Sequence, residues 1–230
     1  MKKWIPILLL VALVGGQLGM IIFNVRSTNR HNELTNVPPR PENLGTALTF
    51  ETIMPYAQRV ANTWQPDAQL VSASMQIDWP EEFDPIQEGG LPPGGWILLG
   101  FVSGDEILTM RIDRGSGTIV QNAIIGISKS ETDTYASHAI DFNQAAVTSV
   151  TAATAFEVSN GERFRQACPQ NRGQSFIRPE LDTASGNWVW DISYIDRPPN
   201  QDVRYMTGQI DWRTGQQTNV KNTDLTCVIN

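Results

Sequence analysis

The stretch Val71–Trp79, with the sequence VSASMQIDW, alternates apolar and polar residues without a break. Successive side chains of a β-strand point to opposite faces, so this alternation predicts a strand with one face in a core. Further strand-like runs follow over residues 96–102, 107–112 and 118–127, separated by short turns that contain Gly. Together these runs predict an antiparallel meander.

A helix is expected directly before this meander. It opens at Thr49, and its apolar residues recur every three or four positions. These residues are Ile53, Ala57, Val60, Ala61 and Trp64. Because this spacing places them on one side of a helix, the segment predicts an amphipathic helix that covers the meander.

The same order of elements starts again at Asp141. Asp141 is expected to cap a second helix, with Gln144 as its capping-box partner. Strand-like runs follow over residues 175–181, 188–194 and 203–212. The sequence therefore predicts an α+β fold with two helix-plus-antiparallel-meander units, residues 46–128 and 141–230, joined by a linker over 129–140. A single mixed α+β domain is the alternative.

Matched positions support a duplication of this unit. Thr49 and Asp141 are 92 residues apart, and so are Trp96 and Trp188. The motif Ile-Asp followed by Gly occurs twice at an offset of 98 residues, ending at Gly117 and at Gly215. The second unit is expected to hold its extra residues in a turn near residues 197–200.

A helix followed by a meander, with Trp opening one strand and Ile-Asp-x-x-x-Gly ending another, resembles the PepSY-like (cystatin-like) domains of bacterial exported proteins. The residues that carry the resemblance are Trp96, Ile112, Asp113 and Gly117 in the first unit and Trp188, Ile210, Asp211 and Gly215 in the second. The resemblance implies a non-catalytic module with a role in peptidase inhibition or protein interaction at the cell envelope. It carries over no catalytic residue.

The first 25 residues predict a transmembrane signal anchor. After two lysines, the apolar run Trp4–Val25 would span roughly 33 Å as a helix, enough to cross a hydrocarbon core. A cleaved signal peptide is the alternative. Gly15, Gly16 and Gly19 would allow close packing against other membrane helices. Residues 26–45 are rich in Asn, Thr and Pro and predict an extended linker.

Topology and charge restrict the partners. The lysines before the apolar run favour a cytoplasmic N-terminus, which places the C-terminal body in the periplasm or outside the cell. Residues 31–230 hold 13 basic and 24 acidic side chains, a net charge of −11. Because such a body repels phosphate groups, nucleic acid is excluded as a partner. The lipid bilayer and other membrane or envelope proteins are the expected partners.

Two acidic residues sit where catalytic carboxylates could be sought. Asp113 and Asp211 each precede a turn with Gly, at Gly117 and Gly215. Asp in such a place bonds the backbone and Gly supplies a positive φ, so both pairs are interpreted as structural turns rather than acid–base catalysts. No motif for a nucleophile, a phosphate or a cofactor is found, and no enzyme activity, cofactor or metal site is expected.

Tryptophan and cysteine provide the remaining candidates. Trp188, Trp190 and Trp212 could form an exposed patch that binds a partner, although core positions are the commoner outcome on alternating strands. Cys168 and Cys227 are the two cysteines, and in an exported body they predict one disulfide; two unpaired buried thiols are the alternative. The acidic loop 78–88 predicts a solvated or partner-facing segment, with a calcium loop as the weaker alternative.

The function expected from the sequence is binding rather than chemistry. A membrane-anchored, extracytoplasmic accessory or assembly subunit of a larger membrane complex is the first hypothesis. A regulator or inhibitor of an envelope peptidase, which the resemblance implies, is the second. An enzyme with an unrecognised site is the third.

Overall fold

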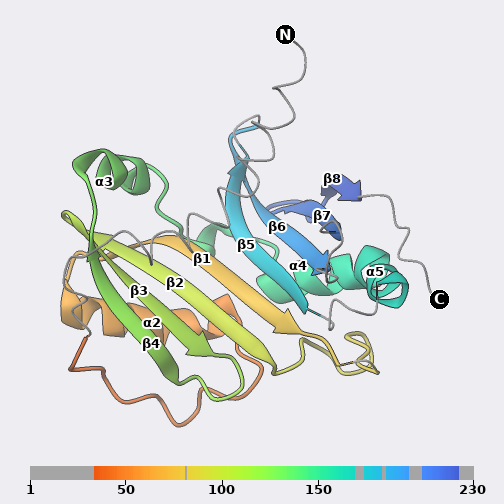
Figure 1. Cartoon of the computed structure of the whole chain (residues 1–230), viewed down its shortest axis with the longest axis horizontal. Helices are drawn as coiled ribbons and strands as arrows, with labels where there is room; N and C mark the ends of the chain where they lie inside the picture. Colours follow the sequence, from red (N-terminus) through yellow and green to blue (C-terminus); the bar gives the residue numbers. More distant parts are fainter. Residues whose placement is uncertain (1–33, 81, 169–173, 183–184, 197–203, 223–230) are drawn as a thin grey trace.

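The computed structural model describes residues 34–80, 82–168, 174–182, 185–196 and 204–222 (Figure 1). A helix is followed by four strands, and a second helical region is followed by four more strands. The α+β class predicted from the sequence is confirmed. Figure 1 also shows that all the strands belong to one broad, twisted sheet, with helices packed against it.

The first half begins with helix α2 (Phe50–Trp64). Thr49, where the helix was expected to open, caps it: its Oγ1 accepts a hydrogen bond from Thr52 N at 3.4 Å, while Thr52 Oγ1 accepts one from Thr49 N at 2.9 Å. Of the apolar positions predicted from the spacing, Trp64 is partly buried and the other four, Ile53 and Val60 among them, are buried. The strands that follow are β1 (Gln69–Asp78), β2 (Gly95–Ser103), β3 (Glu106–Asp113) and β4 (Ile119–Gly126).

Between the two halves the structure has a helix where the sequence predicted a linker over residues 129–140. Helix α3 spans Lys129–Ala136. Ser128 caps it, because the Ser128 hydroxyl accepts from Glu131 N and Glu131 Oε2 accepts from Ser128 N at 2.7 Å. This Ser-x-x-Glu capping box is visible in the sequence and is the signal for the helix.

The second helical region starts later than predicted. Asp141 caps only the short 3₁₀-helix η1 (Phe142–Gln144), and the α-helix begins beyond Thr148, whose Oγ1 accepts from Thr151 N at 3.2 Å. The first residue of this helix also contacts the first half, where both carboxylate oxygens of Glu51 accept hydrogen bonds from Ser149, at 2.6 and 2.7 Å. The region comprises α4 (Ser149–Phe156), the π-helical turn η2 (Glu157–Gly161) and α5 (Glu162–Ala167).

The remaining strands are β5 (Gln174–Asp182), β6 (Asn187–Asp196), β7 (Arg204–Asp211) and β8 (Gln217–Asn222). The sheet has the order β4-β3-β2-β1-β5-β6-β7-β8, and every neighbouring pair is antiparallel. The halves join at the centre, where Met75 of β1 lies opposite Ile177 of β5. The two predicted meanders therefore form one continuous sheet rather than two separate ones.

One face of the sheet carries the main core. Buried side chains of α2, α4 and α5, such as Phe50, Phe156 and Phe164, pack with buried strand residues, such as Leu99 and Tyr194, in a single cluster. On the opposite face, a small cluster of Val71, Val102 and Ile107 is covered by Tyr135 of α3. Outside the area under α3, no helix of the described residues packs on this second face, and we call this uncovered area the helix-free face.

The register corrects one of the matched positions. Asp113 lies opposite Trp96 on β2, whereas Asp211 lies opposite Val189 on β6. Trp96 therefore corresponds to Val189, one residue away from Trp188. Side chains alternate between the two faces of a sheet, so a shift of one residue places Trp96 and Trp188 on opposite faces.

The predicted anchor over residues 1–25, with Gly15, Gly16 and Gly19, lies outside the described residues. Within the part of the chain that is described, no helix is both long and apolar enough to cross a membrane. Of the predicted linker 26–45, residues 34–45 are described and form neither helix nor strand. The Tyr56 hydroxyl of α2 holds this segment by donating to Pro38 O at 3.1 Å.

Candidate functional site

The two Asp–Gly motifs form turns of the same kind after β3 and β7. Asp113 Oδ1 accepts from Ser116 N and Ser116 Oγ, both at 2.7 Å, and Gly117 N donates to Asp113 O at 2.8 Å with φ at +68°. The hydrogen bonds from Ser116 hold the pKa of Asp113 below its ordinary value. The carboxylate is thus used to shape the backbone.

The second turn repeats this arrangement at Asp211. Its Oδ1 accepts from Thr214 N at 2.8 Å and from Thr214 Oγ1 at 3.0 Å, and Gly215 has φ at +71°. The backbone hydrogen bond from Thr214 lowers the pKa of Asp211. Asp113 and Asp211 lie in separate halves of the sheet, on β3 and β7, which are separated by four strands in the sheet order. They do not form a carboxylate pair.

Arg114, inside the first turn, is buried and was not singled out from the sequence. Its Nε donates to Leu48 O at 2.8 Å, and its Nη1 donates to Pro92 O at 3.0 Å and to Gly94 O at 2.6 Å. Burial lowers the pKa of Arg114 to about 10. The side chain therefore ties the start of α2 to the end of the β1–β2 loop.

The three tryptophans proposed as a patch lie mainly inside the protein. Trp190 is 0% and Trp212 is 2% exposed, with ring centres 4.9 Å apart. Trp190 Nε1 donates to Val147 O at 2.8 Å. Trp188 is partly buried and packs on Trp212. Two of the three side chains are therefore core residues with no surface to offer a partner.

Only one cysteine of the predicted disulfide lies within the described residues. Cys168 is 1% exposed at the end of α5, whereas Cys227 lies outside the described residues. The pairing stays a prediction.

The acidic loop between β1 and β2 is fixed to the second half of the chain by its first residues. Trp79 is 4% exposed, and its Nε1 donates to Ser175 Oγ of β5 at 2.8 Å. Further on, Asp84 Oδ1 accepts from Ile86 N at 2.8 Å, which shapes an exposed tip. Among the described residues there is no cluster of three His, Cys, Asp or Glu side chains that could bind a metal ion.

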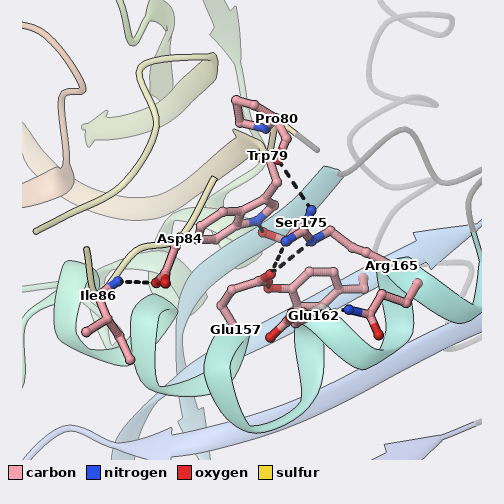
Figure 2. A network of polar contacts seen from close by, with 10 residues as sticks. Trp79, Pro80, Asp84, Ile86, Glu157, Glu162, Arg165 and Ser175 are labelled. Carbon is pink, nitrogen blue, oxygen red and sulfur yellow. Dashed lines mark hydrogen bonds and ion pairs between the residues drawn. The ribbon is translucent and has the colours of Figure 1, made fainter. Parts of the chain in front are cut away.

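A buried polar network lies where this loop meets α5 (Figure 2). Arg165 donates to Glu157 Oε1 through Nε at 2.9 Å and through Nη2 at 2.6 Å. The Tyr194 hydroxyl donates to the other carboxylate oxygen of Glu157. Arg165 also reaches Pro80 O at 3.5 Å and stacks over the Trp79 ring at 5.8 Å.

The chemistry of this network is structural. Glu157 is 1% and Tyr194 is 0% exposed, so neither side chain offers surface to a substrate. Burial, together with the charge of Glu157, raises the pKa of Tyr194 well above its ordinary value, and the phenol stays protonated. Glu157 is the first residue of the π-helical turn, and its carboxylate accepts hydrogen bonds from both Arg165 and Tyr194.

The helix-free face offers a different and accessible arrangement. Gln76 of β1 lies opposite both Trp96 of β2 and Phe176 of β5, so these two aromatic residues flank the central seam of the sheet. Their rings meet edge to face with centres 6.2 Å apart. Arg111 of β3 places its guanidinium 5.1 Å from the centre of the Trp96 ring. Trp96 and Phe176 are only partly buried, and Arg111 is exposed.

A charged cluster adjoins these rings. Arg178 follows Phe176 by two residues on β5 and therefore shares its face. Both Nε and Nη2 of Arg178 lie 2.9 Å from Asp191 Oδ2, and Nη2 lies 3.9 Å from Glu180. Burial raises the pKa of Asp191 despite the opposing charge of Arg178. Burial also raises the pKa of Glu180, with the nearby charge of Asp191 as a further cause.

This aromatic and charged surface on the helix-free face was not singled out from the sequence, and we regard it as the candidate binding site. It consists of Trp96, Arg111, Phe176, Arg178 and Asp191. The period of two over Val71–Trp79 predicted which residues share a face of β1 only. The pairing of β1 with β5, which brings Trp96 and Phe176 together, had no signal in the sequence.

Comparisons with known proteins bear on the fold. No protein-family model matches the sequence, and no curated protein matches it. Among solved structures, the fold is similar to that of a putative lipoprotein from Clostridium difficile 630, with a TM-score of 0.50 and 13% sequence identity. The match covers 77% of this chain and 95% of that chain. At this identity the similarity concerns the fold alone, and the PepSY-like resemblance stays a prediction.

Proposed function

We propose that the protein is a non-catalytic, membrane-anchored binding protein that serves as an accessory or assembly subunit of a larger membrane protein complex. The observation that carries the proposal is the contact of Trp96 with Phe176 on the helix-free face. Aromatic and Arg side chains are the residues that contribute most to binding at protein interfaces. Here the guanidinium of Arg111 lies over the Trp96 ring, and Arg178 follows Phe176 by two residues on β5.

The construction of this surface favours a protein partner over a small substrate. Its residues come from β2, β3, β5 and β6, so the surface spans several neighbouring strands of the sheet. Rigid strands keep the aromatic rings in place, so little conformational entropy is lost when they are covered. The Arg178–Asp191 ion pair adds a polar edge that would fix the orientation of the partner.

The same proposal includes a location at the membrane. The apolar run Trp4–Val25 supports a single-pass anchor with a cytoplasmic N-terminus and a body in the periplasm or outside the cell. The structural neighbour is described as a lipoprotein, a class that is held at a membrane, which agrees with this location.

The tandem PepSY-like architecture is proposed on two observations. Helix and four strands follow each other twice in the same order. In addition, Leu48 N donates to Arg114 O at 3.1 Å before α2, and Val147 N donates to Trp212 O at 2.9 Å before α4. The same backbone bond thus links each helix start to the turn after the third strand of its half.

Purification of the tagged full-length protein from its native membrane in mild detergent, followed by mass spectrometry, tests the proposal. We expect a membrane protein assembly in stoichiometric amount. Recovery of a peptidase instead would favour the regulator hypothesis. Recovery of the protein alone, at detergent concentrations that keep known complexes of the same membrane intact, would contradict the proposal.

A further inference from the structure

The two edges of the sheet differ in how they are protected. Strand β8 has six residues, a positive φ of 52° at Asn219 and a charged residue at Lys221. Such features are the usual means by which proteins prevent a further strand from pairing at an edge. Strand β4 has eight residues, IVQNAIIG, with no charged residue and no Pro.

The backbone of β4 can accept a ninth strand. Ile127 N donates to Asp105 O at 2.7 Å, and Ala123 O accepts from Thr109 Oγ1 at 3.3 Å. The backbone N–H and C=O groups of the odd-numbered residues in this part of the chain therefore face β3. Backbone groups alternate in direction along an antiparallel strand, so those of Asn122, Ile124 and Gly126 face outward. Among the described residues, no strand pairs with this outer side.

From the described part of the chain, Leu34 reaches this edge through a side chain of β4 rather than through its backbone. Leu34 N donates to the side-chain Oδ1 of Asn122 at 2.6 Å. Within the residues that the structure describes, the outward N–H and C=O groups of β4 therefore keep their capacity to pair with another chain.

The side chains of β4 leave apolar surface on both faces of the sheet. Ile119 and Ile124 pack against the main core, and Ile125 packs against the small cluster under α3. All three are only partly buried, because the sheet ends at β4. A further strand with apolar side chains would cover isoleucine surface on both faces at once.

The acidic side chains near the C-terminal end of β4 determine which charges a partner strand should carry there. Gly126 lies opposite Glu106, and the adjacent Asp105 is exposed. Glu131, at the start of α3, is held as a carboxylate beside Ser128. Basic residues are therefore favoured at this end of the partner strand. The net charge of −11 over residues 31–230 opposes pairing with a second copy of the chain.

We propose that β4 binds an extended segment of a partner protein as an antiparallel ninth strand, with β-branched residues along its length and Lys or Arg at its N-terminal end, beside Asp105, Glu106 and Glu131. This proposal rests on the binding function proposed above and adds a second surface to it. Main-chain hydrogen bonds supply the affinity in this mode, and the side chains supply the specificity.

A synthetic peptide, two lysines followed by alternating valine and threonine, is the probe, and amide exchange of the full-length protein in detergent is measured by NMR. We expect the amides of Asn122, Ile124 and Gly126 to exchange at least tenfold more slowly with peptide. A peptide N-methylated at alternate residues should have no effect, and one with two glutamates in place of the lysines should bind at least fivefold more weakly.

Two pairs of variants localise the effect. Asn122→Pro removes an outward N–H, whereas Asn122→Ala keeps it and loses the same contact with Leu34. Val120→Lys places a charge on this edge, and Val220→Lys does so on the opposite edge; both valines are exposed, so neither change disturbs the core. Peptide affinity should fall at least tenfold in Asn122→Pro and Val120→Lys and stay within twofold in the other two.

Three results would overturn the proposal. These are unchanged amide exchange at millimolar peptide, equal binding by Val120→Lys and Val220→Lys, or a dimer of the protein alone that Val120→Lys dissociates, which would assign the edge to a second copy. If the peptide fails to bind while a membrane assembly still co-purifies, the ninth strand is wrong and the binding function stands.

Discussion

Arg165 Nη2 lies 2.6 Å from Oε1 of Glu157, a carboxylate that is 1% exposed between the second helical region and the sheet. The same guanidinium reaches Pro80 O and the Trp79 ring, which belong to the loop between β1 and β2. One side chain thus connects the interior of the second half to a loop of the first (Figure 2). Through this contact the loop is held beside the central seam of the sheet.

Removal of Arg165 should strongly destabilise the protein. Arg165→Met leaves Glu157 charged and buried with Tyr194 as its remaining partner, and loss of one member of a buried ion pair costs about 3–5 kcal/mol. Glu157→Gln combined with Arg165→Met should cost less than the sum of the single changes, since no unpaired charge is left. Urea unfolding of the four proteins measures both effects. Additive losses would contradict the coupling.

The turn after β3 should depend on glycine. A Cβ at Gly117 would lie 2.7 Å from Arg40 Nε and 3.0 Å from Leu48 Cδ1, and the residue has φ at +68°. We expect Gly117→Ala to lower the free energy of unfolding by about 1–3 kcal/mol. Gly126→Ala is the matched control, because nothing lies within 4 Å of a Cβ there, and it should change stability by less than about 0.5 kcal/mol. Equal losses would show that the turn geometry is not the cause.

Acid should weaken the same turn through Asp113. Its pKa is lowered in the folded protein, so the unfolded chain binds a proton first as pH falls below the ordinary value of 3.8. The stabilisation is therefore complete above about pH 5 and is lost as pH falls through the lowered pKa. Asp113→Asn removes this titration.

The stability gap between wild type and Asp113→Asn isolates the effect of this carboxylate from other titrating groups, such as Asp191, whose pKa is raised. This difference in the free energy of unfolding, measured by urea unfolding from pH 2 to pH 7, should become smaller as the pH falls. A gap that does not change with pH would mean that the charge of Asp113 contributes nothing to the turn.

Truncation of the tryptophans should follow their burial. Trp212→Ala removes a ring that is 2% exposed and should cost about 3–5 kcal/mol. Trp188→Ala removes a partly buried ring at the margin of the core and should cost clearly less. Thermal unfolding of both variants gives the comparison. A larger loss for Trp188→Ala would contradict the assignment of Trp212 to the core.

Local patterns in the sequence predicted much of the fold. The alternation over Val71–Trp79, the helix start at Thr49 and the turns at Asp113 and Asp211 depend on near neighbours. The structure has this strand, this helix start and these turns where they were expected. Helix α3 also had a local signal, the capping box at Ser128, which was overlooked.

Features that depend on distant residues were missed or misplaced. The second helix starts beyond Thr148, where Ser149 contacts Glu51, which is 98 residues away in sequence. The pair Trp96 and Phe176 forms because β1 pairs with β5, and no local pattern encodes that register. The network around Glu157 likewise assembles residues from a loop, a helix and two strands.

The most direct test of the central claim is a comparison of co-purification between the full-length wild type and the double variant Trp96→Ala, Arg111→Ala. Both side chains lie on the helix-free face at the candidate site. We predict that a membrane assembly accompanies the wild type and is reduced at least tenfold with the double variant, while Val220→Lys, at the far edge, retains it. Equal recovery of the assembly with all three proteins, at matched expression and melting temperature, would contradict the claim that this face binds the partner.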